Sequence, residues 1–343
     1  MIKKSPLFLL AATLLLASCS SGKSSYSGLS SSATSATTQT STSLSSEPSE
    51  SGLSSSASSS ASSQAFDFAP YQQKYGTFSV DPGEYGSYTY DESSSTYTFA
   101  VAESKAEYTI KGAFMGSIVI DNVNNLSSYK GVKITFNEAA IVSFANSQAA
   151  IVYKPESKNV EIKAQKGTNN EIVSLGASSA VYSKKNIEFS GKGKLVATAI
   201  PSSASDTPHT FEADGDMAFG SAIELTVVNS AHDAFHGKHL SFEDDDAVAY
   251  SGKLTVTNAA SQAFDFETNQ GKGSIAIQGG TIVVNGAASV FKTDATLDIA
   301  SGVTVTASDL SEDPVVAGDA STGLTVNNQG TFTVDGEPYV FSA

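Results

Sequence analysis

Carboxylates recur in the middle of this chain at positions that suit turns. Nine of the ten carboxylates between positions 214 and 267 lie at such positions: Asp214, Asp216, Asp233, Glu243, Asp244, Asp245, Asp246, Asp265 and Glu267. Calcium takes six to eight oxygen ligands, mostly carboxylates and backbone carbonyls. We therefore predict calcium as a cofactor, with Asp214, Asp216, Asp233 and Asp265 as its ligands. The alternative is a solvated acidic face on a chain of net charge −15. The spacing is not that of an EF-hand loop.

Three of the four histidines, His232, His236 and His239, fall within eight residues. Together with Asp233 they have the residue types of a transition-metal site or an acid–base group. Neighbours along a strand point to opposite sides, however, so three ligands from one strand seldom converge. This favours surface histidines beside a turn. Lys238 follows closely and would suit a polyanion, although a solvated lysine explains it equally well.

The side chains named above belong to an internal sequence repeat, whose fold would set their positions. Between Ile223 and Thr268 an alternating strand, a phrase Asn-x-Ala and a small-then-apolar pair occur twice. Similar pairs recur every 24 to 30 residues: Ala150-Ile151, Ala180-Val181, Thr210-Phe211, Ala234-Phe235, Ala263-Phe264, Ser289-Val290, Pro314-Val315 and Pro338-Tyr339. A period of this length that keeps strand alternation is typical of a solenoid, in which each unit buries its apolar face against its neighbours.

The content of each unit indicates which solenoid this is. Segments 186–198, 273–285 and 295–306 each hold two short alternating runs divided by glycine, which predicts strands rather than helices. We therefore expect an all-β chain forming a right-handed parallel β-helix of eight to nine coils. Polar excursions at 201–208 and 309–314 interrupt the coils, and such insertions often lie on a binding face.

The first 19 residues have the pattern of a lipoprotein signal peptide. Lys3 and Lys4 precede an apolar run too short to span a bilayer. The run ends in Leu16-Ala-Ser-Cys19, which resembles the bacterial lipobox. Cys19 is the only cysteine, so it forms no disulfide within the chain, and acylation explains it best. We predict lipidation of Cys19 and anchoring at the extracellular face of the cell membrane, with the lipid as the only membrane contact.

A tether and a cap lie between this anchor and the coils. In residues 20–64, 28 of 45 are Ser or Thr, so we expect a disordered tether that buries too little apolar surface to fold. Residues 65–343 should form the β-helix domain, of which 65–103 is a cap and first strand. The tyrosines near the cap offer an alternative interpretation as a platform on which sugars stack.

Several segments resemble the bacterial secreted proteins called carbohydrate-binding domain-containing proteins. The best matching stretches are Lys166 to Ile172 and Ser179 to Leu195, and His232 to Lys238 is similar to a recurring Asp-Asp-Gly step of that family. The resemblance implies a right-handed parallel β-helix that binds polygalacturonate or cellulose, with aspartates that carry calcium and uronate. On this basis His232, Lys238 and the nine carboxylates above are the candidate carbohydrate- and calcium-binding residues. The chain departs from the family where Ala234 replaces its glycine.

Composition bounds the remaining alternatives. The 20 basic residues are all lysines, whereas β-helix pectate lyases commonly use arginine as a base, and the hydrolases carry Gly-His-Gly and Arg-x-Lys elements that this chain lacks. We therefore predict no catalytic residues and a non-enzymatic function. A chain of net charge −15 lacks the basic stripe that nucleic acid requires, and it would repel a polyuronate unless calcium bridges them.

We accordingly expect a monomer that binds extracellular polysaccharide, either a polyuronate or a cellulose-like chain, without cleaving it. Two alternatives stay open. One is a surface adhesin or structural protein that contacts other proteins, and the other is a β-helix lyase or hydrolase.

Overall fold

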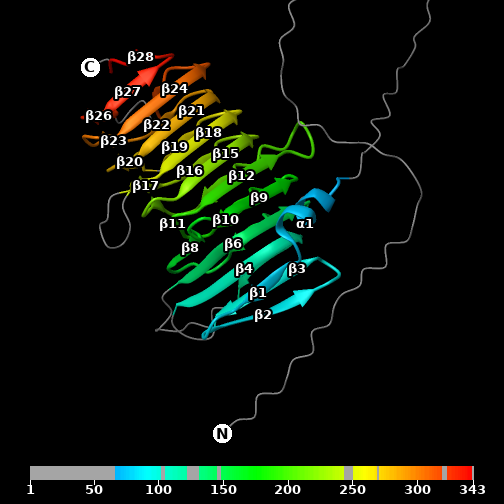
Figure 1. Ribbon diagram of the computed structural model, residues 1–343. Coiled ribbons are helices and arrows are strands. Elements are labelled where there is room, and N and C mark those ends of the chain that lie inside the picture. The colour runs from blue at the N-terminus through cyan, green and yellow to red at the C-terminus, as the bar shows by residue number, and fades with distance from the viewer. Residues whose placement is uncertain are drawn as a thin grey trace, which may run out of the picture. The chain divides into compact units, whose positions relative to one another are not determined.

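The computed structural model describes residues 66–101, 105–121, 131–144, 148–242, 250–268, 270–318 and 323–341. The predicted lipid-anchor and tether segments, and the acidic run Glu243 to Asp246, lie outside these ranges. One compact unit spans Gln64–Ala343. It is an all-β solenoid of about eight turns, which confirms the predicted fold class, and its strands stack in chain order along one axis (Figure 1). The right-handed sense stays a prediction.

Each regular coil contributes three strands: a short one of three residues, a second of three to six residues and a third of up to seven residues. The short strands form a sheet with the order β2 (Gly86–Asp91), β3 (Thr96–Val101), β5 (Ser117–Asp121), β7 (Ile151–Tyr153), β10 (Val181–Ser183), β13 (Phe211–Ala213), β16 (Phe235–Gly237), β19 (Phe264–Phe266), β22 (Phe291–Thr293) and β25 (Val315–Ala317).

The longer strands lie in two parallel columns that the model joins into one sheet. The first column runs through β4 (Ala106–Met115), β6 (Val132–Ser143), β8 (Asn159–Ala164), β11 (Asn186–Gly191), β14 (Met217–Phe219), β17 (His239–Ser241), β20 (Ser274–Ile277), β23 (Thr296–Ile299) and β26 (Thr325–Asn328). The second runs from β6, which spans both columns, through β9 (Asn169–Leu175), β12 (Lys194–Ile200), β15 (Glu224–Ser230), β18 (Lys253–Ala259), β21 (Thr281–Ala287), β24 (Thr304–Leu310) and β27 (Thr331–Val334).

The interior follows the alternation of the sequence. In β15 and β18 the residues Leu225, Val227, Leu254 and Val256 are fully buried while the residues between them are not. At the end of each of these strands the chain turns through a left-handed residue, Asn229 at φ 61° and Asn258 at φ 58°. Asparagine tolerates this conformation better than most side chains do, which explains the repeated Asn-x-Ala phrase.

The predicted apolar ladder is confirmed over five coils and again at Val315, which pairs with Phe291, but it is wrong at two positions. Ile151, Val181, Phe211, Phe235 and Phe264 pair in register and are fully buried. The next member is Phe291 and not Val290. Val290 takes the place that a small alanine holds in earlier coils, because the backbone N–H of Phe264 donates to Val290 just as that of Phe235 donates to Ala263.

The last predicted step is also wrong. Tyr339 follows β28 (Glu337–Pro338), which turns back antiparallel against β27 and begins no further parallel coil. Its ring packs against Phe332 and Phe341 over the end of the core, with centroids 5.3 and 5.0 Å away.

The other end of the solenoid is covered by irregular structure. Helix α1 (Ala69–Tyr75) contacts β4 and β6, strand β1 (Ser79–Asp81) pairs antiparallel with β4, and β2 and β3 form an antiparallel hairpin. Among the described residues no helix has both the length and the apolar character needed to cross a membrane. The predicted cap segment therefore holds the only described helix and joins the parallel stack through β3, which pairs with β5.

Candidate functional site

Three histidines surround one buried carboxylate on the short-strand side of the solenoid. The Nδ1 atoms of His232, His209 and His236 lie 2.9, 3.2 and 3.6 Å from Oδ2 of Asp233. The Asp233 side chain is 1% exposed, whereas the His209, His232 and His236 side chains are 17, 40 and 36% exposed. The ring of His209 stacks on that of His236, with centroids 4.3 Å apart. We call these four residues the His–Asp cluster.

Stacking of coils creates the His–Asp cluster from residues that are distant in sequence. Asp233 lies in the turn before β16, and Thr210, one residue after His209, donates its backbone N–H to the Asp233 carbonyl in the adjacent coil. In the strand itself Glu212, His236, Asp265 and Lys292 pair in one lateral row. Adjacent coils bring such side chains within about 5 Å of each other.

Hydrogen bonds hold both the side chain and the backbone of Asp233 in place. The carboxylate Oδ1 accepts the backbone N–H of Gln262 at 2.9 Å, and the backbone carbonyl oxygen of Asp233 accepts the Ser230 hydroxyl at 2.7 Å. Burial disfavours the ionised form, but His209 and His236 outweigh that effect and hold the pKa of Asp233 well below its usual range. The carboxylate is therefore charged at neutral pH.

The pKa of Asp265, the second acid in this row, shifts in the opposite direction from that of Asp233. Burial, helped by the negative charge of Asp233, raises the pKa of Asp265 to about 6. Its Oδ2 lies 3.9 Å from Nδ1 of His236 and 3.3 Å from Nζ of Lys292. Lys292 also pairs with Glu267 at 2.5 Å, so one lysine partly neutralises both carboxylates. The pKa of His236 is raised, chiefly by its interaction with Asp233.

The structure thus brings together only part of the predicted site. Asp233, His232, Asp265 and Glu267 lie in the region just described. Asp214 and Asp216 follow β13, at the opposite end of the short strand from the turn of Asp233, and Asp214 accepts from the Tyr182 hydroxyl at 3.0 Å. Lys238 follows β16 at that same end. Glu243, Asp244, Asp245 and Asp246 lie outside the described residues.

This placement bears on the predicted ion. The four predicted calcium ligands are divided, because Asp233 precedes a short strand, Asp265 lies within one, and Asp214 and Asp216 follow one. The nearest polar neighbours of the Asp233 Oδ2 are imidazole nitrogens. Calcium takes oxygen ligands almost exclusively, so the described residues around Asp233 do not fit it. Calcium binding stays a prediction.

The sequence favoured surface histidines beside a turn, and the structure brings only two of the three, His232 and His236, beside Asp233. His239 lies in β17 on another face of the coil, where its Nδ1 is 2.9 Å from the Ser274 hydroxyl. Its place is taken by His209, which the sequence pattern did not single out. The available signal was register: His209 stands two residues before the ladder member Phe211, as Asp233 stands two before Phe235.

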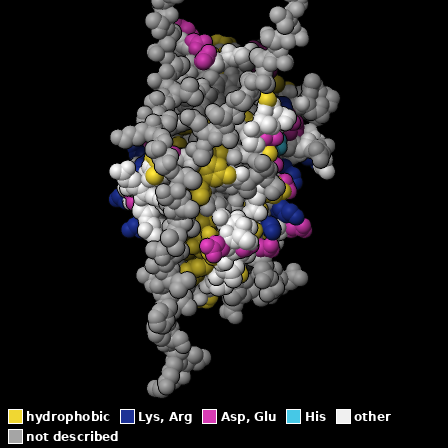
Figure 2. Space-filling view, turned by 90° about the vertical axis from the view of Figure 1, so that its right-hand side faces the viewer, with side chains coloured by type: hydrophobic (Ala, Val, Ile, Leu, Met, Phe, Trp, Pro, Cys, Tyr) yellow, Lys and Arg dark blue, Asp and Glu magenta, His cyan; other side chains and the backbone are white. Residues whose placement is uncertain are grey.

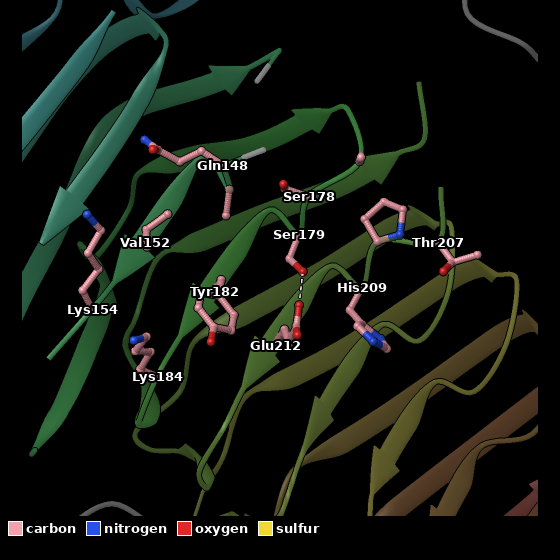
Figure 3. Close-up of a pocket in the computed structure, with 13 residues that line it drawn as sticks. Gln148, Val152, Lys154, Ser178, Ser179, Tyr182, Lys184, Thr207, His209 and Glu212 are labelled. Atoms are coloured by element: carbon pink, nitrogen blue, oxygen red, sulfur yellow. Dashed lines mark hydrogen bonds between the residues drawn. The ribbon is translucent and has the colours of Figure 1, made fainter. Parts of the chain in front are cut away.

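A groove lies next to the His–Asp cluster along the short-strand sheet, with a volume of about 630 Å³. Ala149, Val152 and Tyr182 form an apolar patch on this outer face, and Lys154, Lys184, Glu212 and Gln148 stand around it (Figure 3). Thr207, Pro208 and His209 line one end. The polar excursion at 201–208 therefore does contribute to the rim of this groove.

The polar groups of the groove are held by their neighbours. Glu212 accepts from the Ser179 hydroxyl at 2.5 Å (Figure 3). Lys154 pairs with Asp121 at 3.0 Å and Lys184 approaches Glu156 at 4.0 Å. Burial and the hydrogen bond to Asp214 raise the pKa of Tyr182 to about 12. Like any tyrosine, it is uncharged at neutral pH. A flat uncharged ring beside hydrogen-bonding groups suits a sugar.

The tyrosines near the N-terminal end do not form a single platform. Tyr75 is buried and donates to Glu171 at 2.7 Å, while Tyr88 and Tyr90 are 39 and 47% exposed on β2. Tyr97 packs between Tyr90, Phe78 and Phe114 at centroid distances of 4.6 to 5.2 Å. Most of this region packs against the end of the core.

The described face in Figure 2 carries lysines and acidic side chains close to one another, beside a broken stripe of hydrophobic side chains. Charges of both signs on one face do not favour a polyanion as strongly as a basic stripe would.

The fold and the groove together define a parallel β-solenoid with a ligand-sized depression on its short-strand face. The model of one family, described as carbohydrate-binding domain-containing protein, matches residues 95–339, so the chain belongs to that family. No curated protein matches the chain.

A solved structure titled "Structure of the polysaccharide lyase-like protein from C. thermocellum, Gadolinium derivative" is similar in fold. It has a TM-score of 0.51 and 16% sequence identity, and the match covers 68% of this chain and 89% of that one. At this identity the likeness shows the fold alone.

Proposed function

We propose that the domain binds extracellular polysaccharide in the groove of the short-strand sheet and does not cleave it. Membership of a carbohydrate-binding family supports the ligand class. The observation that carries the proposal is the flat ring of Tyr182, half-buried beside Val152 and flanked by Lys154, Lys184 and Glu212 in the groove. A sugar ring would stack on the tyrosine while its hydroxyls bond to the flanking groups.

A binding rather than a catalytic role is part of this proposal. An inverting glycosidase needs two carboxyls about 6.5–9.5 Å apart on either side of the bond, and a retaining one about 5–5.5 Å apart. Glu212 is the only carboxylate that lines the described groove. The chain also has no arginine to act as the base of a lyase-type elimination. The fold shared with a lyase-like protein carries no argument for catalysis.

The proposal also covers the location of the protein and the role of calcium. We infer a lipid anchor at Cys19 and display outside the cell, which rest on the sequence pattern alone. Calcium is proposed only as a bridge to an acidic polysaccharide, because a chain of net charge −15 repels a polyuronate.

The test is retention of the full chain on immobilised polygalacturonate and on cellulose, with calcium or with a chelator. Tyr182→Ala should weaken binding by about two- to tenfold, as expected for an aromatic contact of about 0.5–1.5 kcal/mol. Tyr90→Ala, which removes a 47% exposed tyrosine at the far end of the domain, is the control. Equal retention of both variants would exclude the groove. Release of reducing or unsaturated ends during the assay would overturn the non-catalytic role.

A further inference from the structure

Three residues of the His–Asp cluster have the geometry of ligands around a small ion. Zinc binds histidine nitrogen at about 2.0–2.1 Å and carboxylate oxygen at about 2.0–2.2 Å in a tetrahedron, which places neighbouring ligand atoms about 3.4 Å apart. The Nδ1 atoms of His232 and His209 lie 2.9 and 3.2 Å from the same Asp233 oxygen, close to the tetrahedral value, and the ligand atoms of these three residues all lie within 4.8 Å of one another. His236 belongs to a second group with Asp233 and Asp265. Its ring stacks nearly parallel on that of His209, so these two rings do not point at a common ion.

Unsatisfied atoms give an independent indication. Nδ1 of His209, Nδ1 of His236 and Oδ1 of Asp265 are buried and have no hydrogen-bond partner among the described residues. Buried polar atoms normally have partners. A single carboxylate oxygen serves His232 at 2.9 Å but leaves Nδ1 of His209 without a well-aligned hydrogen bond. An ion held by His209, His232 and Asp233 would give this Nδ1 a bond.

The surroundings hold the carboxylate ready for such an ion. The backbone N–H of Gln262 occupies Oδ1 of Asp233, so Oδ2 is the atom that faces the three rings. Outer partners of this kind orient the ligands of metal sites. Asp265 stands behind His236 and is itself paired with Lys292, which places it outside the set of direct ligands.

We propose that His209, His232 and Asp233 bind a divalent transition-metal ion of the zinc type. Two imidazoles and one carboxylate favour zinc, nickel or copper over calcium, which prefers oxygen, and they leave the fourth position of the tetrahedron to water. The site is independent of the proposed polysaccharide binding, since it shares only His209 with the groove. If a glycan binds there, the ion lies at one end of the occupied groove.

The experiment is a zinc titration of the full chain carrying Cys19→Ser, so that the only thiol does not compete for the metal. Competition with a chromophoric chelator should give one zinc ion per chain. Cobalt(II) in place of zinc should give the visible bands of a tetrahedral site, and the melting temperature should rise with free zinc. Calcium at the same concentration should not displace the cobalt.

Two variants and one control decide the outcome. His232→Ala and His209→Gln each remove one proposed ligand, and each should weaken zinc binding by more than the about 10- to 100-fold typical of losing an outer partner. His239→Ala, a histidine on another face bonded to Ser274, should bind like the parent. Absence of stoichiometric zinc, or equal affinity in all three variants, would overturn the site.

Discussion

The ring of Phe235 lies parallel to that of Phe264, with centroids 5.0 Å apart and an interplanar angle of 4°. The same contact continues to Phe211 at 5.2 Å and to Phe291 at 5.5 Å. All four rings are fully buried. Because each coil buries its phenylalanine against the next coil, this ladder couples the stability of neighbouring coils.

Phe235→Ala should therefore destabilise the domain strongly. Loss of a fully buried phenylalanine leaves a cavity and costs about 3–5 kcal/mol, and Phe235→Asp should cost at least as much because it buries an unpaired charge. Denaturant unfolding followed by circular dichroism measures the loss. Val340→Ala, at a residue that is 83% exposed, should change little. A tolerated Phe235→Asp would contradict the register.

The buried Glu161 should make part of the stability depend on pH. Burial opposes its ionisation, but Lys105 at 2.6 Å and the Ser190 hydroxyl at 2.7 Å prevail, so its pKa is lowered on folding. A lowered folded pKa means that the charged form stabilises the fold at neutral pH. This contribution is lost as the pH falls below the usual value of about 4.3 and through the folded pKa.

Glu161→Gln should accordingly lose about 1.5–3 kcal/mol at neutral pH, the value of a hydrogen bond to a charged group. The difference from the parent should shrink in acid. Urea unfolding at several pH values tests this, with Glu156→Gln as the control because that side chain is 86% exposed. A difference that stays constant with pH would show that the charge of Glu161 is not what matters.

The two groove lysines should distinguish acidic from neutral polysaccharide. Lys154→Gln with Lys184→Gln removes the positive charges that line the groove. Retention on polygalacturonate should fall, and more so at low salt, because salt screens exposed charges. Retention on cellulose should stay within about twofold, since a neutral chain loses no charge contact. Lys253→Gln, on the second column of longer strands, is the control.

Cys19→Ala should abolish anchoring if the lipobox interpretation holds. The variant should accumulate as an unlipidated precursor or appear in the medium, because its first residue can no longer be acylated. Detergent phase partitioning and metabolic labelling with a fatty acid measure this. A variant that partitions and labels like the parent would exclude Cys19 as the anchor.

The fold class could be predicted from the sequence because strand alternation is visible within short segments and the same segments recur along the chain. Leu225, Val227 and Phe235 recur as Leu254, Val256 and Phe264, so alternation and period alone predict stacked parallel coils. The pattern failed at Val290, where a large residue takes the place of a small alanine and shifts the apparent step by one. Only packing against Phe264 assigns Phe291 to the ladder.

The site depended on contacts that the sequence does not record. His232, His236 and His239 are near neighbours in the chain, but β16 and β17 lie on different faces of one coil, so His239 points to another part of the surface. Sequence spacing also grouped Asp214 and Asp216 with Asp233, although they flank opposite ends of a short strand. The lateral register of the coils, set by burial of the phenylalanine ladder, decided instead that His209 meets Asp233 and that Asp265 meets Lys292.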